Sequence, residues 1–148
     1  MADSRDVRRL RRGYEAFNRG DFETVLRDVS PDVEVRDRDE IPDPGVYRGL
    51  DAVREIFARN TAEFEDYRVD PEEFIEVGEH IVVVARQSGR GRASGAPVSG
   101  TIVHAWHLRD GRVVGMRAFS DPEQALAAIR HGHQETQTPP ADAGWSAS

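Results

Sequence analysis

The sequence predicts a single α+β domain in which helices cover one face of an antiparallel β-sheet. Three observations support this. Apolar residues recur at helical spacing through the first 64 residues, the pattern changes to strand-like alternation from Tyr67 onward, and turn residues separate the alternating segments. The 148 residues match the usual length of one domain, which can bury a core of its own without disulfides or a metal.

The first segment predicts a helix and then a second, shorter one. Apolar positions recur three or four residues apart, at Val7, Leu10, Tyr14 and Phe17. Residues 18–21 break this helix, because Gly20 suits a left-handed cap and Asp21 can cap the helix that follows. That helix spans residues 22–26, and we expect residues 30–32 to end it.

The middle of the chain predicts one strand and a third helix. Residues 33–37 alternate with period two and predict the strand, and residues 38–49 are rich in proline and glycine and predict a loop. The third helix begins at Asp51. Its apolar stripe consists of Ala52, Val53, Ile56, Phe57 and Phe64, and Asn60 falls on the same side.

Four antiparallel strands and a short helix are predicted next. The strands are residues 67–77, 81–89, 96–108 and 112–119, with hairpin turns at 78–80 and 109–112, the second containing a strong Asp-Gly signal. The helix begins at Asp121 as N-cap, with proline in its first turn. Residues 131–148 are polar and aperiodic, which predicts a disordered tail after a domain of residues 1–130.

Composition excludes several kinds of chemistry. Cysteine is absent, which excludes thiol nucleophiles, thiolate metal sites and disulfides. All 20 basic residues are arginine, which excludes Schiff-base chemistry through lysine. The net charge of -7 argues against nucleic acid as a partner. No run approaches the ~20 apolar residues that a membrane span needs, so we expect a cytoplasmic protein without a membrane partner.

The strand at residues 96–108 carries two histidines among apolar residues. Alternation places Ile102, His104, Trp106 and Leu108 on the face under the helices, and Thr101, Val103, Ala105 and His107 on the outer face. Histidines on opposite faces cannot bind one metal, so no metal site is predicted. Two interpretations of His104 stay open: a structural histidine bonded to a carbonyl, a carboxylate or water, or an acid or base facing a cavity.

The motifs AFNRGD, GVYRGLDAVREIF and HLRDGRVVGMRAF follow one another along the chain. With them, residues 7–129 resemble the SnoaL-like branch of the nuclear transport factor 2-like superfamily, whose members include ketosteroid isomerases and polyketide cyclases. The resemblance implies a cone, a cystatin-like roll in which a curved antiparallel sheet wraps around three helices and leaves a deep apolar pocket. It also implies a homodimer through the outer face of the sheet, where Val103, Ala105 and Val113 are expected.

The resemblance suggests site residues position by position. The aspartate base of ketosteroid isomerases corresponds to Asp37, their first-helix tyrosine falls at Gly13 with Tyr14 one residue along, and His104 replaces their second oxyanion acid. Steroid isomerisation is therefore not the favoured reaction. Polyketide cyclases use an aspartate and a histidine in the same cavity, and Asp37 and His104 supply those types. The epoxide hydrolases of the superfamily need two aspartates beside an arginine, and Arg86 lacks them.

Two carboxylates also have structural interpretations. Asp37 is either a base or a strand-end carboxylate paired with Arg36 or Arg38 at the rim of the pocket. Asp121 lies where a catalytic acid could stand beside the last strand, but helix capping explains it fully and is the favoured interpretation.

The resulting hypothesis is a protein without cofactors that binds a hydrophobic, polyketide- or steroid-like molecule. Asp37 and His104 are the expected catalytic pair for isomerisation, cyclisation or dehydration through an enol-like intermediate. The expected substrate-binding residues are Tyr14, Phe57, Trp106, Met116 and Arg86. The alternative is a non-catalytic module that uses the same pocket for ligand binding or dimerisation.

Overall fold

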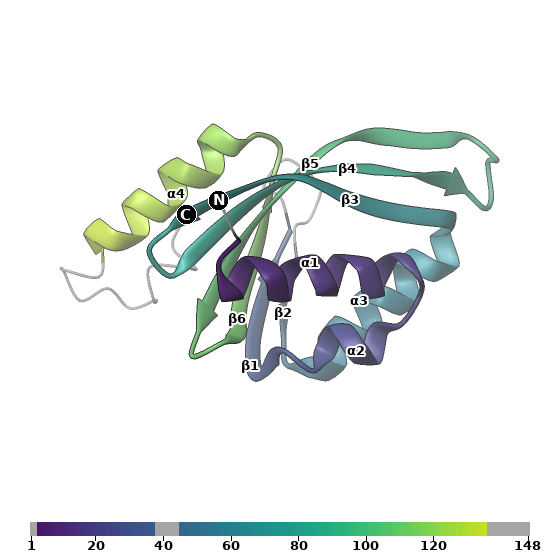
Figure 1. Cartoon of the computed structure of the whole chain (residues 1–148). Coiled ribbons are helices and arrows are strands. Elements are labelled where there is room, and N and C mark those ends of the chain that lie inside the picture. The colour runs from purple at the N-terminus through teal and green to yellow at the C-terminus, as the bar shows by residue number, and fades with distance from the viewer. Residues whose placement is uncertain (1–2, 38–44, 136–148) are drawn as a thin grey trace.

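The structure, a computed structural model, describes residues 3–37 and 45–135. They form four helices and one six-stranded, curved and open sheet (Figure 1). The helices are α1 (Arg5–Asn18), α2 (Phe22–Leu26), α3 (Leu50–Glu63) and α4 (Pro122–Glu135). The strands are β1 (Val29–Arg36), β2 (Val46–Arg48), β3 (Phe64–Val77), β4 (His80–Gly91), β5 (Pro97–Arg109) and β6 (Arg112–Phe119), in the spatial order β2-β1-β6-β5-β4-β3.

The predicted break between α1 and α2 is confirmed. Gly20 has φ +79, a conformation that glycine adopts without strain, and the Asp21 carboxylate accepts a hydrogen bond from the Thr24 amide at the start of α2. The Asn18 side chain accepts from the Val69 amide at 2.8 Å and donates to the Val69 carbonyl at 3.0 Å. This motif therefore also fixes the end of α1 against β3.

The region between α2 and α3 differs from the prediction. Residues 30–32 were expected to end α2, but they lie inside β1, which begins at Val29. The predicted loop contains β2, which pairs antiparallel with β1. Pairing with β1 supplies the backbone hydrogen bonds that a three-residue strand cannot provide alone. The rest of that loop, residues 38–44, lies outside the described residues.

The sheet is mixed rather than fully antiparallel. β1 pairs with β6 in parallel, joining Val35 to Met116, while all the other pairs are antiparallel. The three hairpin strands β4, β5 and β6 lie close to their predicted bounds. β3 begins at Phe64, which the prediction had assigned to the third helix. That side chain stacks on Tyr67 across the start of the strand.

The predicted tight turn between β5 and β6 is confirmed. Asp110 and Gly111 both have positive φ, +53 and +77, as a two-residue type I′ hairpin requires. A bulge between His107 and Leu108 then shifts the pairing with β6. Val113 was expected on the outer face, but because a bulge changes which residues share a face, it belongs to the inner core.

Helices cover both faces of the sheet, which corrects the prediction that they share one. Figure 1 shows α1, α2 and α3 on the concave side and α4 across the opposite side. On that outer face, the buried side chains of α4 pack on the sheet; the cluster comprises Val82, Val103, Ala105, Phe119, Ala125 and Ile129. Asp121 caps α4 by accepting from the Gln124 amide at 2.9 Å, as predicted.

The last helix extends beyond the predicted domain end. α4 continues to Glu135, so residues 131–135 are helical, and the remaining predicted tail, residues 136–148, lies outside the described residues. None of the helices described here has the length and apolarity needed to cross a membrane.

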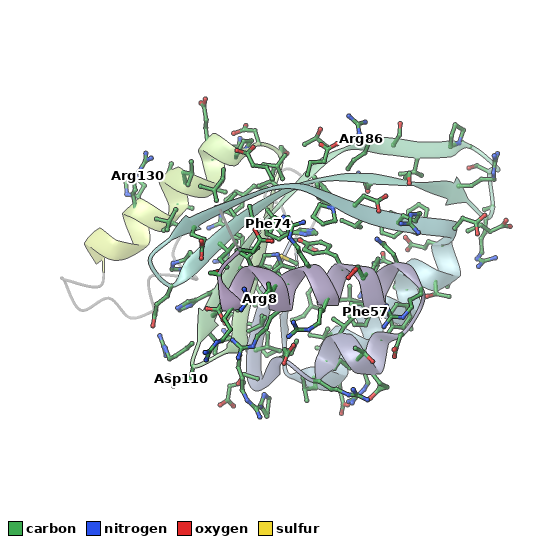
Figure 2. The ribbon with its side chains drawn as sticks, in the orientation of Figure 1. Arg8, Phe57, Phe74, Arg86, Asp110 and Arg130 are labelled. Carbon is green, nitrogen blue, oxygen red and sulfur yellow. The ribbon has the colours of Figure 1, made fainter. Side chains whose placement is uncertain are left out.

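The larger core lies between the concave face and α1–α3. It contains buried residues from α1, α2 and α3, together with alternate residues of β1, β3, β4, β5 and β6. Phe74 of β3 lies between the sheet and α1, where the Arg11 guanidinium stands 4.4 Å from its ring centre (Figure 2). This core does not fill the space under the sheet, and the remaining cavity is the candidate site.

Candidate functional site

A cavity of about 290 Å³ lies under the concave face of the sheet. α1 and α3 form one wall, and the inward side chains of β1, β3, β5 and β6 form the other. Most of the lining is apolar: Leu10, Phe17, Val25, Val29, Val35, Ile56, Phe57, Val69, Ile102, Leu108, Val113, Met116 and Ala118. A small molecule of one or two rings fits such a volume.

Part of the cavity lining is aromatic. The Phe57 ring of α3 stacks on Phe22 at 4.8 Å between ring centres and meets Phe17 at 5.6 Å. Phe57 and Met116 were both predicted to bind ligand, and both line the cavity. Their contacts are apolar and would exclude water from a ligand rather than orient it.

Three polar rings meet where α1 faces β5. The Tyr14 hydroxyl oxygen lies 2.7 Å from His104 Nδ1 and 2.9 Å from Trp106 Nε1, which donates to it. The Tyr14 and His104 rings are stacked, and the Trp106 ring stands edge-on to both. Inward alternation along β5 brings His104 and Trp106 to the same wall, and the third turn of α1 brings Tyr14 between them.

Burial controls the ionisation of this cluster. It lowers the pKa of His104 from 6.5 to about 4 and raises the pKa of the Tyr14 phenol above its ordinary value, the raising effect being opposed by the hydrogen bond from Trp106. His104 is half-buried and lines the cavity. At neutral pH both side chains are therefore uncharged.

Asp37 reaches the cavity from the end of β1. Its Oδ2 accepts hydrogen bonds from the Gly45 amide at 3.0 Å and from the Tyr47 hydroxyl at 3.3 Å, both at the start of β2. Arg59 of α3 donates to the same Tyr47 hydroxyl at 3.2 Å. The carboxylate is thus held by the β1–β2 hairpin, and it lines the same cavity as His104.

Several polar lining residues were not among the predicted site residues. Asn60 of α3, Tyr67 of β3, and Arg9 and Asp28 near the β5–β6 turn also line the cavity. A signal existed for Asn60, because a polar residue on the apolar stripe of a predicted helix often faces a cavity. No local pattern distinguishes Arg9 or Asp28 from the other charged residues of the chain.

Arg86 lies outside the cavity, although it was expected to bind ligand. Alternation along β4 places its side chain on the outer face, where it is 58% exposed and pairs with Glu72 at 3.7 Å. Figure 2 shows it pointing away from α1–α3. His107 is also on that face, stacked on His80 and bonded to Glu79. Within residues 3–37 and 45–135, no group of three or more potential metal ligands occurs.

The arrangement can perform acid–base chemistry or simple binding. An apolar cavity that holds one carboxylate and one neutral imidazole can remove a proton from carbon and stabilise the oxygen that receives the charge. The same cavity can also hold an apolar molecule without reaction.

The comparisons with known proteins agree with this fold. The chain is similar to an NTF2-like protein of unknown function from Burkholderia pseudomallei, at 30% identity, a TM-score of 0.71, and coverage of 86% of this chain and 97% of that one. It is similar to TerC, co-crystallised with polyporic acid (25% identity, TM-score 0.70, coverage 86% and 99%). It shares its fold with IdmH, a candidate polyketide cyclase from Streptomyces antibioticus (23% identity, TM-score 0.69, coverage 86% and 99%).

No curated protein matches the chain. The family model for the SnoaL-like domain matches residues 10–116, which include α2, α3, β1–β5 and most of α1 and β6. The predicted resemblance is confirmed: the chain belongs to the family of SnoaL-like domain proteins.

Proposed function

We propose that the protein is a cofactor-independent acid–base catalyst that acts on an apolar small molecule in its cavity. The reaction is an isomerisation, cyclisation or dehydration that passes through an enol-like intermediate. In this proposal Asp37 is the base that takes a proton from carbon, and His104 is the polar partner of the substrate oxygen.

One observation carries the proposal: a carboxylate and a neutral imidazole, Asp37 and His104, line one largely apolar cavity. Burial of that kind strengthens electrostatic contacts with a reacting molecule and excludes competing water. Two similar proteins give further support, because TerC was co-crystallised with a small organic molecule and IdmH is named as a candidate polyketide cyclase.

Proton removal from carbon can be tested with a probe molecule in place of the natural substrate. 2-Tetralone is a two-ring ketone with acidic C–H bonds beside its carbonyl, and it is small enough for the cavity. We expect the protein to accelerate exchange of those hydrogens in D₂O, followed by NMR. The Asp37→Asn variant should lose about 100-fold or more of this acceleration, since the amide is isosteric but cannot accept the proton.

The matched control is Asp32→Asn. Asp32 is an exposed aspartate on the same strand and does not line the cavity, so its variant should exchange the probe as fast as the wild type. Exchange at the buffer rate in the wild type, with binding of 2-tetralone intact, would instead establish the alternative function of a ligand-binding module. Equal rates in the Asp37→Asn variant and the wild type would remove Asp37 as the base.

The homodimer through the outer sheet face stays a prediction, with a narrower surface than the sequence indicated. Val103 and Ala105 are covered by α4, and Val113 faces the cavity. A dimer would therefore use the outward side chains of β3–β5 that α4 leaves uncovered, including Arg86. Light scattering on the wild type and on Arg86→Glu tests this, because reversal of charge at the interface should dissociate such a dimer.

A further inference from the structure

The three polar rings on the cavity wall define the direction of their hydrogen bonds. An indole Nε1–H can only donate, so the Tyr14 oxygen accepts from Trp106 at 2.9 Å. The hydroxyl carries a single proton of its own, and the acceptor within reach is His104 Nδ1 at 2.7 Å. Trp106 therefore donates to Tyr14, and Tyr14 donates to Nδ1 of His104, which is the final acceptor in this series of hydrogen bonds.

This direction fixes the tautomer of the imidazole. A neutral histidine that accepts at Nδ1 carries its proton on Nε2. The opposite tautomer would direct both the Nδ1–H and the Trp106 N–H at the Tyr14 oxygen. The buried Tyr14 hydroxyl would then have no acceptor for its own proton among the described residues. Such an arrangement is strongly disfavoured, because buried donors are almost always paired.

The second nitrogen of His104 is open to the cavity. Nε2 makes no hydrogen bond within the part of the chain that the structure describes, and it is not among the atoms sealed from solvent without a partner. His104 itself lines the cavity. The protein thus presents one N–H donor, held in a fixed orientation, on a wall that is mostly apolar.

We infer that Tyr14 and Trp106 are positioning residues that hold His104 as an Nε2–H donor, and that the ligand is an uncharged, apolar molecule presenting a carbonyl oxygen to it. An ammonium or amide N–H at that place would face another donor and be rejected. Tyr14 and Trp106 line the cavity with their rings, but their polar atoms are occupied with one another and with His104.

The role of His104 in the reaction rests on the proposed function. When the C–H bond beside the carbonyl breaks, its proton passes to the Asp37 carboxylate and its electron pair moves to the carbonyl oxygen. The Nε2–H bond to that oxygen shortens as its charge grows, and the imidazole stays neutral. The proton then returns from Asp37 to carbon at the same or a neighbouring position.

The tautomer can be measured directly in the wild-type protein. Long-range ¹⁵N–¹H NMR separates a ring nitrogen that bears a proton from one that does not, and the His104→Asn variant identifies the His104 signals among the five histidines. At pH 7 we expect a protonated Nε2 and an unprotonated Nδ1. A protonated Nδ1 in the spectrum of the wild-type protein would overturn the inference.

Two variants test the positioning role. Tyr14→Phe removes the donor to Nδ1, and Trp106→Phe removes the N–H that occupies the Tyr14 oxygen while keeping an aromatic ring. Each should produce a mixture of the two tautomers. If Tyr14→Phe does not fold, Trp106→Phe still tests the positioning role. A folded variant whose spectrum matches that of the wild type would contradict that role.

Binding of matched probes tests the ligand class. 2-Tetralone and tetralin share their ring system and differ in the carbonyl oxygen. Titration calorimetry should show that the wild type binds 2-tetralone at least about 10-fold more tightly than tetralin. In the Tyr14→Phe variant this preference for the ketone should fall below about 3-fold. Equal affinities in the wild type would refute the carbonyl assignment. Ketone preference without hydrogen exchange would refute the proposed catalysis and leave this inference intact.

Discussion

The His104 imidazole should make the stability of the protein depend on pH in a defined window. Its pKa is 6.5 in an unfolded chain and about 4 in the fold. Between these values the unfolded state binds more protons, so this residue contributes stability that is complete above pH 6.5 and is lost as pH falls toward 4. From pH 7 to pH 5 we expect a loss of about 2 kcal/mol from this group.

Urea unfolding of the wild type and of His104→Asn at both pH values measures that contribution. The asparagine oxygen can occupy the place of Nδ1 and accept from Tyr14, so the variant keeps the hydrogen bond without the titration. The charged residues that line the cavity, Arg9, Asp28, Arg36 and Asp37, are the same in both proteins. If the free energy of unfolding changed by the same amount between pH 7 and pH 5 in the wild type and in His104→Asn, the imidazole would not be desolvated.

The contact between Tyr14 and His104 shows how far single residues can be predicted. Helical spacing and strand alternation each turn one of these side chains inward, and both predictions required only local sequence. The hydrogen bond joins residues 90 apart, and no local rule sets which inward residues meet. The prediction for Arg86 has a related weakness. It considered only the residue type, which can bind a ligand, whereas the alternation of β4 places Arg86 on the outer face.

At the scale of elements, α1 contains a glycine that its backbone does not need. Gly13 lies in the middle of the helix, and an added Cβ would meet no atom within 4 Å. Gly13→Ala should therefore raise the free energy of unfolding by about 0.5–1 kcal/mol, because alanine loses less conformational entropy in a helix. Since Gly13 lines the cavity, the new methyl group would also narrow it, which calorimetry with 2-tetralone can detect.

Gly20→Ala is the matched control for that change. Its Cβ would also meet open space, but Gly20 has φ +79, where an L side chain is strained. This variant should lose about 1 kcal/mol of stability. If both alanine variants shifted the unfolding midpoint in the same direction, backbone conformation would not be the cause.

The position of α4 predicts that stability and ligand binding can be separated. Ile129 is 2% exposed and packs in the outer-face cluster, on the opposite side of the sheet from the cavity. Ile129→Ala should cost about 2–4 kcal/mol by leaving a void, with unchanged affinity for 2-tetralone. The exposed Arg130, which points away from the sheet in Figure 2, provides the control, since Arg130→Ala should change stability by less than about 0.5 kcal/mol.

Elements were predicted well where their own sequence determines them. The α1–α2 break, the Asp-Gly hairpin and the cap of α4 each depend on a few adjacent residues, and all three are confirmed. β2 has three residues and depends on its pairing with β1, so its own sequence carries too weak a signal. The face that α4 covers was also not predictable, because its apolar stripe fits either side of the sheet.

At the scale of the whole molecule, the two faces of the single sheet pack differently. The concave face and α1–α3 leave a cavity, whereas the outer face and α4 form a smaller cluster of fully and nearly fully buried residues. β5 contributes to both through alternation, with His104 inward and Val103 and Ala105 outward. The resemblance in sequence predicted the curvature of the sheet around the first three helices, which local patterns do not show, but it did not predict that α4 covers the outer face.

The connectivity of this sheet predicts how the chain folds. β4 and β5 form a hairpin of neighbouring segments, whereas β1 pairs with β6 from the far end of the domain. Closing a long loop costs entropy before its contacts form, so we expect the hairpin first, the β1–β6 pairing late, and refolding on a millisecond-to-second timescale. Val83 in β4 and Val33 in β1 report on these two steps, since both are at most 1% exposed.

Val83→Ala and Val33→Ala should each cost about 2 kcal/mol, which is enough for reliable kinetics. Stopped-flow measurements should show Val83→Ala mainly slowing folding and Val33→Ala mainly accelerating unfolding, because contacts absent from the transition state affect only the unfolding rate. The reverse assignment would mean that β1 docks on β6 before the hairpin is complete. In that case the wall of the cavity that carries Asp37 would form before the wall that carries His104.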